Sequence, residues 1–154
     1  MLKAIALLPK EVHLILVGSG VLLEEKKQLA TTLGIENRVH FLGRRNDVNR
    51  LLKTADISVL SSNYEGFGIS IVEGMAVGKP CLASDVSGLS EVMGNSELLF
   101  KPKDHLQLKE KLQRLFSDTN YYNKIAKKCQ KRAQEFDISL MIEAHINLYK
   151  ELTK

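Results

Sequence analysis

Short apolar runs alternate with helical patterns between residues 12 and 100, and this alternation constrains the fold more than any other feature. We expect five strands, each short, apolar and followed by a turn, at residues 12–17, 39–42, 57–60, 81–83 and 98–100. Helical patterns fill the gaps, for example residues 23–33, which end at Gly34, and residues 48–54, which begin after Asp47. The pattern predicts an α/β fold with a doubly wound parallel sheet whose strands are buried on both faces.

The chain beyond residue 100 is wholly helical in pattern. Asp104 and Gln107 have the spacing of a capping box and precede an apolar helical stripe. Two more stripes follow, one through Ile125 and Cys129 and one through Met141 and Leu148. We therefore expect C-terminal helices after the last strand.

Length and composition fit one domain spanning residues 1–154. The 22 basic and 18 acidic side chains leave a net charge of +4, too small to indicate nucleic-acid binding without a basic patch joined to a reading motif. No apolar run approaches the length of a membrane span, and we expect no signal peptide. Cys81 and Cys129 lack CxxC spacing, which is typical of reduced core thiols in a cytoplasmic protein.

Residues 1–9 have the pattern of the later part of a helix that should follow a strand. We therefore expect the sheet to lack its first strand and the chain to be a fragment of a longer protein.

Two glutamates, Glu65 and Glu73, bracket an apolar run that contains glycine. Residues 69–77 leave almost no polar face, so we expect a buried helix with Glu73 about one turn inside it. A buried carboxylate needs hydrogen-bond donors, and a ligand diol is a natural partner. The alternative is structural, with Glu65 capping the turn and Glu73 paired with a Lys or Arg.

A turn at Gly66, Phe67 and Gly68 precedes this helix. Glycine lets a ligand approach the backbone, and the N–H groups of Phe67, Gly68 and Ile69 at the helix start form a site for phosphate. An anion flanked by hydroxyl groups describes a nucleotide sugar.

Gly18-Ser19-Gly20 follows an expected strand and precedes an expected helix, as a dinucleotide-binding turn does. Leu23 stands where the third glycine of that motif belongs, and Arg44 and Arg45 follow the next strand in place of an acid. These differences favour a nucleotide sugar over NAD.

Residues 62–68, 73–80 and 84–88, together with Glu91, resemble the C-terminal domain of the retaining glycosyltransferases of family 4, also called glycosyltransferase group 1. The specific element is the pair of glutamates with seven residues between them in a glycine-rich frame. The likeness runs from Gly18 to the final helix ending at Tyr149. It implies the Rossmann-like half of a GT-B fold.

The resemblance also implies an activity, which is retaining transfer of a hexose from a UDP-sugar or GDP-sugar in bacterial capsule, exopolysaccharide or lipopolysaccharide synthesis, without a cofactor. It assigns Glu65 to the donor-sugar hydroxyls, Glu73 to the ribose diol, and the amides of residues 67–69 to the phosphate. By position, Leu42, Gly43 and Arg44 are candidates near the nucleotide base, although an ordinary polar turn is the alternative.

In the resembling family, an Arg and a Lys before residue 1 would hold the diphosphate. An N-terminal domain would supply the site for an acceptor sugar or lipid-linked glycan, so we expect the isolated chain to be inactive. Departures from the family pattern are Gly74 for the usual Ala, Ser87 for the usual Gly, and residues 97–99 without the usual Thr-Gly.

Other readings stay open. A GT-B-type sugar-nucleotide epimerase would share this architecture, and a non-catalytic flavodoxin-like regulatory domain could use Asp56 or Asp85 as an acceptor residue. The four histidines share no ligand spacing, so we expect no metal site. A basic helix face at residues 124–132 is either an ordinary solvated surface or a peripheral contact with an anionic membrane.

Overall fold

The computed structural model describes residues 1–153. Its strands are β1 (Leu14–Val17), β2 (Val39–Gly43), β3 (Ser58–Leu60), β4 (Cys81–Ser84) and β5 (Leu99–Phe100). Its α-helices are α1 (Leu2–Ala6), α2 (Leu23–Thr32), α3 (Val48–Thr54), α4 (Ile69–Ala76), α5 (Ser87–Met93), α6 (His105–Ser117), α7 (Thr119–Ala133) and α8 (Ile138–Leu152). Short 3₁₀ helices are η1 (Glu36–Arg38), η2 (Ser96–Leu98) and η3 (Gln134–Phe136). All five predicted strands are present, with ends that differ by two residues or fewer.

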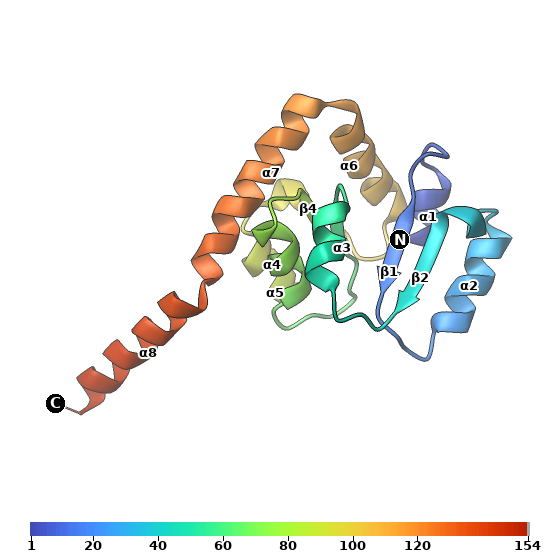
Figure 1. The fold of residues 1–154 in the computed structure, drawn as a ribbon. Helices are drawn as coiled ribbons and strands as arrows, with labels where there is room; N and C mark the ends of the chain where they lie inside the picture. Colours follow the sequence, from blue (N-terminus) through green and yellow to red (C-terminus); the bar gives the residue numbers. More distant parts are fainter. Residues whose placement is uncertain (154) are drawn as a thin grey trace.

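The strands are parallel, as predicted, but they pair in two groups. β1 pairs with β2 in one sheet, and β3, β4 and β5 form the other in that order. Figure 1 shows β1 and β2 beside α1 and α2, while β4 lies among the helices of the other group. The α/β class predicted from the alternating pattern is therefore confirmed.

The β1–β2 sheet is buried on one face only, so the prediction that every strand is buried on both faces is wrong. Leu14 and Val39 are buried in the core, together with Leu2 of α1. Ile15 and Val17 point the other way and are 40% and 42% exposed. The two apolar runs in fact alternate, and among the described residues no helix covers their second face.

β4 meets the prediction for a doubly buried strand. All four of its residues are buried, because β3 and β5 flank it and α4, α5 and α7 pack against it. Cys81 of β4 and Cys129 of α7 are buried free thiols, as predicted. The contact with Cys129, together with burial, raises the pKa of the Cys81 thiol well above its usual value.

The C-terminal helices begin as their sequences predict. The Asp104 carboxylate accepts the backbone N–H of Gln107 at 2.9 Å, and the Gln107 side chain accepts the N–H of Lys101 at 2.6 Å. α7 buries Ile125 and Cys129 against the domain. α8 then extends away from the body of the domain, with all of its residues exposed (Figure 1).

Arg132 ties α7 to α5. Its guanidinium donates to the carbonyl oxygens of Glu91 at 2.7 Å and Val92 at 2.9 Å, where α5 has unpaired carbonyls near its C-terminus. Arg132 also pairs with Glu135 and lies 4.9 Å from the centre of the Phe136 ring. These contacts fix the end of α7 at the point where η3 begins.

Gly74 packs α4 directly against β3. A Cβ at Gly74 would lie 2.7 Å from Cβ and Oγ of Ser58 and 3.2 Å from Sγ of Cys81. The alanine usual at this position in the resembling family therefore has no room here. The small residue compensates for Ser58 on the facing strand.

We expect Gly74→Ala to destabilise the domain by roughly 1–3 kcal/mol through overpacking, despite the better helix propensity of alanine. Ser58→Gly removes the facing side chain and should relieve the overpacking. The double variant should therefore lose less unfolding free energy than the two single losses added together. Urea unfolding of the four proteins measures the coupling. Gly20→Ala is the matched control, because nothing lies within 4 Å of a Cβ at Gly20. Equal stability of wild type and Gly74→Ala would contradict the packing argument.

Candidate functional site

A turn after β3 leads directly into α4 and carries the first candidate carboxylate. Ser84 is 1% exposed, and its hydroxyl donates to the carbonyl oxygen of Ser62 at 2.5 Å, which holds the chain where it leaves β3. The Ser62 hydroxyl in turn donates to Oε2 of Glu65 at 3.3 Å. Glu65 is half-buried. It therefore has a defined place with part of its carboxylate open to solvent.

The N-terminal end of α5 packs against this turn. A Cβ at Gly88 would lie 2.1 Å from the carbonyl oxygen of Gly66 and 2.5 Å from that of Glu65. Only a glycine at position 88 lets the two segments approach this closely. Gly66 itself has open space where its side chain would be, so the outer side of the turn is free for a ligand.

Gly68 turns the chain into α4. Its φ of +81° lies in the left-handed region, and a Cβ there would lie 2.4 Å from Cδ2 of Leu89. A side chain at Gly68 would thus disturb folding as well as any ligand. The glycine is required by the fold before ligand binding is considered.

The first amides of α4 have no partner within the described part of the chain. The N–H groups of Ile71 and Val72 donate to the carbonyl oxygen of Gly68, whereas no acceptor among residues 1–153 faces those of Phe67, Gly68 and Ile69. No side chain caps this helix start either. Unpaired amides and the positive end of the helix dipole favour an anion at this position.

Glu73 is exposed, so the prediction of a carboxylate inside a buried helix is wrong. α4 packs on β3, β4 and α7 through a face that contains Ile71, Gly74 and Met75. Glu73 lies on the opposite face with Ile69, which is 67% exposed. Among residues 1–153 Glu73 makes no ion pair, so the alternative that it pairs with a Lys or Arg is not seen there. Its carboxylate remains available to a ligand beside the start of the helix.

Gly18 and Arg44 come together at the carboxyl ends of β1 and β2. Gly18 has a φ of +125° and donates its N–H to the carbonyl oxygen of Gly43 at 2.7 Å. Arg45 makes two hydrogen bonds of 2.8 Å to Asp47, and this lowers the pKa of the Asp47 carboxyl. Arg44 is exposed and makes no hydrogen bond within the described chain. Of the two arginines, Arg44 is therefore the one available to bind a ligand.

The structure thus gives two groups of candidate residues. Glu65, the amides of residues 67–69 and Glu73 form one group around the start of α4, and Gly18 with Arg44 forms the other at the second sheet. Both groups follow the carboxyl ends of parallel strands, which is where open α/β sheets bind ligands. No hydrogen bond or ion pair within residues 1–153 joins the two groups.

Sequence reasoning missed the support behind this site. Phe67 meets Phe136 edge to face, with ring centres 5.4 Å apart, so η3 packs against the glycine turn. A cavity of about 390 Å³ opens beside this contact and is lined by Phe67, Glu135, Phe136, Asp137, Leu140 and Met141. The sequence shows two aromatic residues, Phe67 and Phe136, but gives no sign that they meet. They lie far apart along the chain, so their contact could not be predicted from local pattern.

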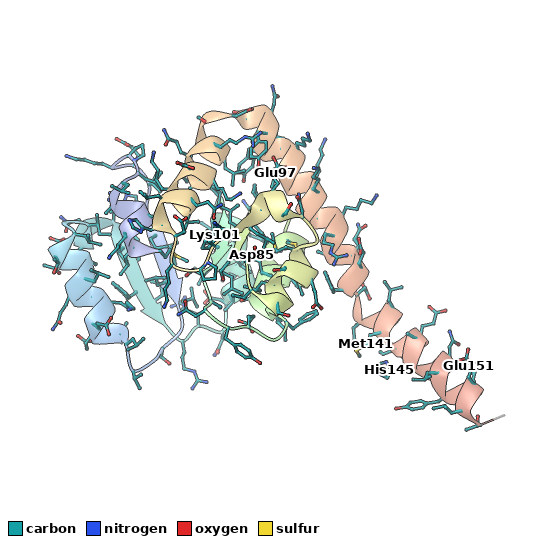
Figure 2. All side chains as sticks on the ribbon, turned by 180° about the vertical axis from the view of Figure 1, so that it is seen from behind. Asp85, Glu97, Lys101, Met141, His145 and Glu151 are labelled. Atoms are coloured by element: carbon teal, nitrogen blue, oxygen red, sulfur yellow. The ribbon has the colours of Figure 1, made fainter. Side chains whose placement is uncertain are left out.

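The loops that follow β4 and β5 also meet, at the same carboxyl edge of the sheet as the turn after β3. Figure 2 shows Asp85 and Lys101 close together at the body of the domain, well away from Met141, His145 and Glu151 on α8. The N–H of Asp85 donates to the carbonyl oxygen of Phe100 at 2.7 Å, and its carboxylate accepts the Ser90 hydroxyl at 2.7 Å. Asp85 is thus engaged in fixing the start of α5.

No group of three or more His, Cys, Asp or Glu side chains within residues 1–153 is arranged to hold a metal ion. Within the same residues, no helix is both long enough and apolar enough to cross a membrane.

Comparison with known proteins identifies relatives of this arrangement. The N-acetyl-alpha-D-glucosaminyl L-malate synthase of Bacillus anthracis is 29% identical over 147 residues, which are 94% of this chain and 39% of that enzyme. The N,N'-diacetylbacillosaminyl-diphospho-undecaprenol alpha-1,3-N-acetylgalactosaminyltransferase of Campylobacter jejuni is 35% identical over 118 residues, 75% of this chain and 31% of that enzyme. The chain thus spans 39% or less of the length of these two relatives.

Solved structures agree with the fold. Anabaena HepE in complex with UDP superposes with a TM-score of 0.92 at 31% identity, covering 97% of this chain and 44% of HepE. The match corresponds to the Rossmann-like half of a GT-B glycosyltransferase and confirms the predicted fold. The family model for glycosyl transferases group 1 matches residues 1–135. Since that match covers most of the sequence, this chain belongs to the group 1 glycosyl transferases.

Proposed function

We propose that this chain is the donor-binding domain of a retaining hexosyltransferase that uses a UDP-sugar or GDP-sugar in bacterial surface polysaccharide synthesis. The observation that carries the proposal is the start of α4, where unpaired amides lie next to an open Gly66 and between two available carboxylates. Anabaena HepE, which has this fold, was solved in complex with UDP-glucose. The Campylobacter relative acts on a lipid-linked diphosphate, as its name states.

Each candidate residue then has a role set by its position. The amides of residues 67–69 bind the diphosphate, and Glu73 accepts hydrogen bonds from the two ribose hydroxyls. Glu65, held by Ser62, binds hydroxyls of the donor sugar at the reacting end. Gly18 and Arg44 contact the nucleotide at the base side, and Gly66 allows the ligand to approach the backbone.

The chemistry follows from these roles. The bond between the anomeric carbon and the diphosphate oxygen breaks, and negative charge develops on the leaving diphosphate. Amides that already point at that oxygen stabilise the charge without reorganising, so a metal ion is not required. The acceptor hydroxyl then attacks from the face that the diphosphate leaves and gives its proton to an oxygen of the leaving diphosphate, which retains the anomeric configuration.

The proposed whole protein has a second domain that binds an acceptor sugar or a lipid-linked glycan. We place the reaction in the cytoplasm, where the exposed basic face of α7 could contact an anionic membrane surface. This face consists of Lys124, Lys127, Lys128 and Lys131. Arg132 is excluded from it, because its guanidinium binds the carbonyl oxygens of α5.

Substituting the two glutamates should weaken the binding of different parts of the donor. Glu73→Ala should weaken binding of UDP and of UDP-glucose alike, by roughly 1.5–3 kcal/mol for lost charge-assisted bonds. Glu65→Gln should weaken UDP-glucose binding and leave UDP binding unchanged. Calorimetric titration of both ligands measures this difference, with GDP and GDP-mannose as the second ligand pair.

The matched control for both variants is Glu110→Gln, an exposed carboxylate on α6. Because Glu73 is exposed, its removal should change the unfolding free energy by about 0.5 kcal/mol or less. A large loss of stability with unchanged nucleotide affinity would make Glu73 structural. Equal losses for UDP and UDP-glucose in Glu65→Gln would place Glu65 at the nucleotide end.

Two glycines, Gly66 in the turn and Gly88 in α5 behind it, should separate folding from binding. Gly66→Ala should leave stability unchanged, since its Cβ points into open space, and should weaken UDP binding where the ligand needs that space. Gly88→Ala should destabilise the domain by roughly 1–3 kcal/mol, because backbone atoms stand where its Cβ would be. Thermal unfolding and UDP titration of both variants test the pair. Normal UDP affinity in Gly66→Ala would argue against backbone approach at this turn.

The 154-residue chain alone should bind nucleotide weakly and transfer no sugar, since the proposal assigns the acceptor site to a second domain. A longer protein that contains this chain should give a product with the same anomeric configuration as the donor, read by NMR. Sugar transfer by the isolated chain would contradict the two-domain proposal, and an inverted product would contradict the retaining mechanism.

A further inference from the structure

Two histidines that are far apart in the sequence meet on the open face of the β1–β2 sheet. His13 immediately precedes β1, and His40 lies in β2, where it is in register with Ile15. Side chains two residues apart on a strand point to the same face, so His13 lies on the face that carries Ile15 and His40. Both histidines are exposed.

The two imidazole rings meet edge to edge, through one nitrogen of each ring. Nδ1 of His13 and Nε2 of His40 are 3.0 Å apart. The rings are nearly parallel, with an angle of 6° between their planes and 5.3 Å between their centres. One of the two nitrogens carries the hydrogen of this contact, and the other accepts it.

This separation suits two ligands of one metal ion. Imidazole nitrogens bind Zn²⁺ at about 2.0–2.1 Å, so two of them at a right-angled or tetrahedral ion stand roughly 2.9–3.4 Å apart. The observed 3.0 Å lies in that interval. Because the two nitrogens lie nearly on the line between the ring centres, each exposed ring must turn by roughly 35–45° to aim its lone pair at a shared ion. The strand pairing of β1 and β2 supplies the backbone rigidity that such a pair requires.

We propose that His13 and His40 form a site for one transition-metal ion of the kind that favours imidazole, namely Zn²⁺, Ni²⁺ or Cu²⁺. Water completes the coordination, since no third His, Cys, Asp or Glu within residues 1–153 joins the pair. When the ion binds, the ring that carried the shared hydrogen loses it to water and takes up one on its other nitrogen. Both rings stay neutral, and both facing nitrogens donate a lone pair to the metal.

The site is separate from the proposed nucleotide site. It lies where β1 and β2 begin, whereas Gly18 and Gly43 lie where these strands end. A bound ion would link two strands that, within residues 1–153, form a two-stranded sheet of their own. It should therefore stabilise the folded chain, with the logarithm of the metal concentration once that concentration exceeds the dissociation constant, and independently of nucleotide binding.

The test is a titration of the purified 154-residue chain with ZnCl₂ by calorimetry, followed by NMR with NiCl₂. Wild type should bind one zinc ion, and His13→Gln or His40→Gln should each lower the affinity by about tenfold or more. His145→Gln is the matched control and should bind like wild type, because its ring lies on α8, with Nδ1 2.8 Å from the carbonyl oxygen of Met141. Paramagnetic nickel should broaden the ring signals of His13 and His40 first.

Thermal unfolding of the metal-free variants shows whether each substitution leaves the fold intact. Zinc should raise the midpoint temperature of unfolding of wild type but not that of His40→Gln. The proposal is overturned if zinc does not saturate the wild type by roughly 1 mM, or if both histidine variants bind it as tightly as wild type. Nickel broadening confined to His105 or His145 would also overturn it. None of these outcomes depends on sugar-nucleotide binding.

Discussion

The close contact between the start of α5 and the turn before α4 organises the candidate site. Gly88 allows the carbonyl oxygens of Glu65 and Gly66 to approach α5, and Leu89 fills the space beside Gly68. This contact fixes the direction in which α4 begins, and thereby the direction of its unpaired amides. The position of the anion site is therefore a consequence of packing behind the turn, while its outer side stays open.

The same principle explains a departure from the family pattern. Gly74 stands where the family usually has alanine, and the reason lies on the facing strand, where Ser58 occupies the space of the missing methyl group. Close packing makes the two positions depend on each other, because a core without voids cannot accept one more methyl group on its own. The departure is a local exchange of volume and leaves Glu73 in place.

Sequence patterns predicted the secondary structure closely and burial less well. Apolar runs located all five strands within two residues, and Asp104 with Gln107 located the start of α6. The apolar composition of α4 suggested a helix buried all round, yet Ile69 is 67% exposed. Hydrophobicity along a helix reports which residues could be buried, whereas actual burial depends on whether another element packs there.

The sequence by itself determined the family, the order of strands and helices, and the identity of the candidate carboxylates, because these depend on local pattern and on specific residue types at fixed spacing. The tertiary structure alone decided that Glu73 is accessible, that Arg44 rather than Arg45 is free, and that His13 faces His40. Each of these facts depends on contacts between segments far apart in the chain. Spacing along one segment carries no information about such contacts, so only the folded chain reveals them.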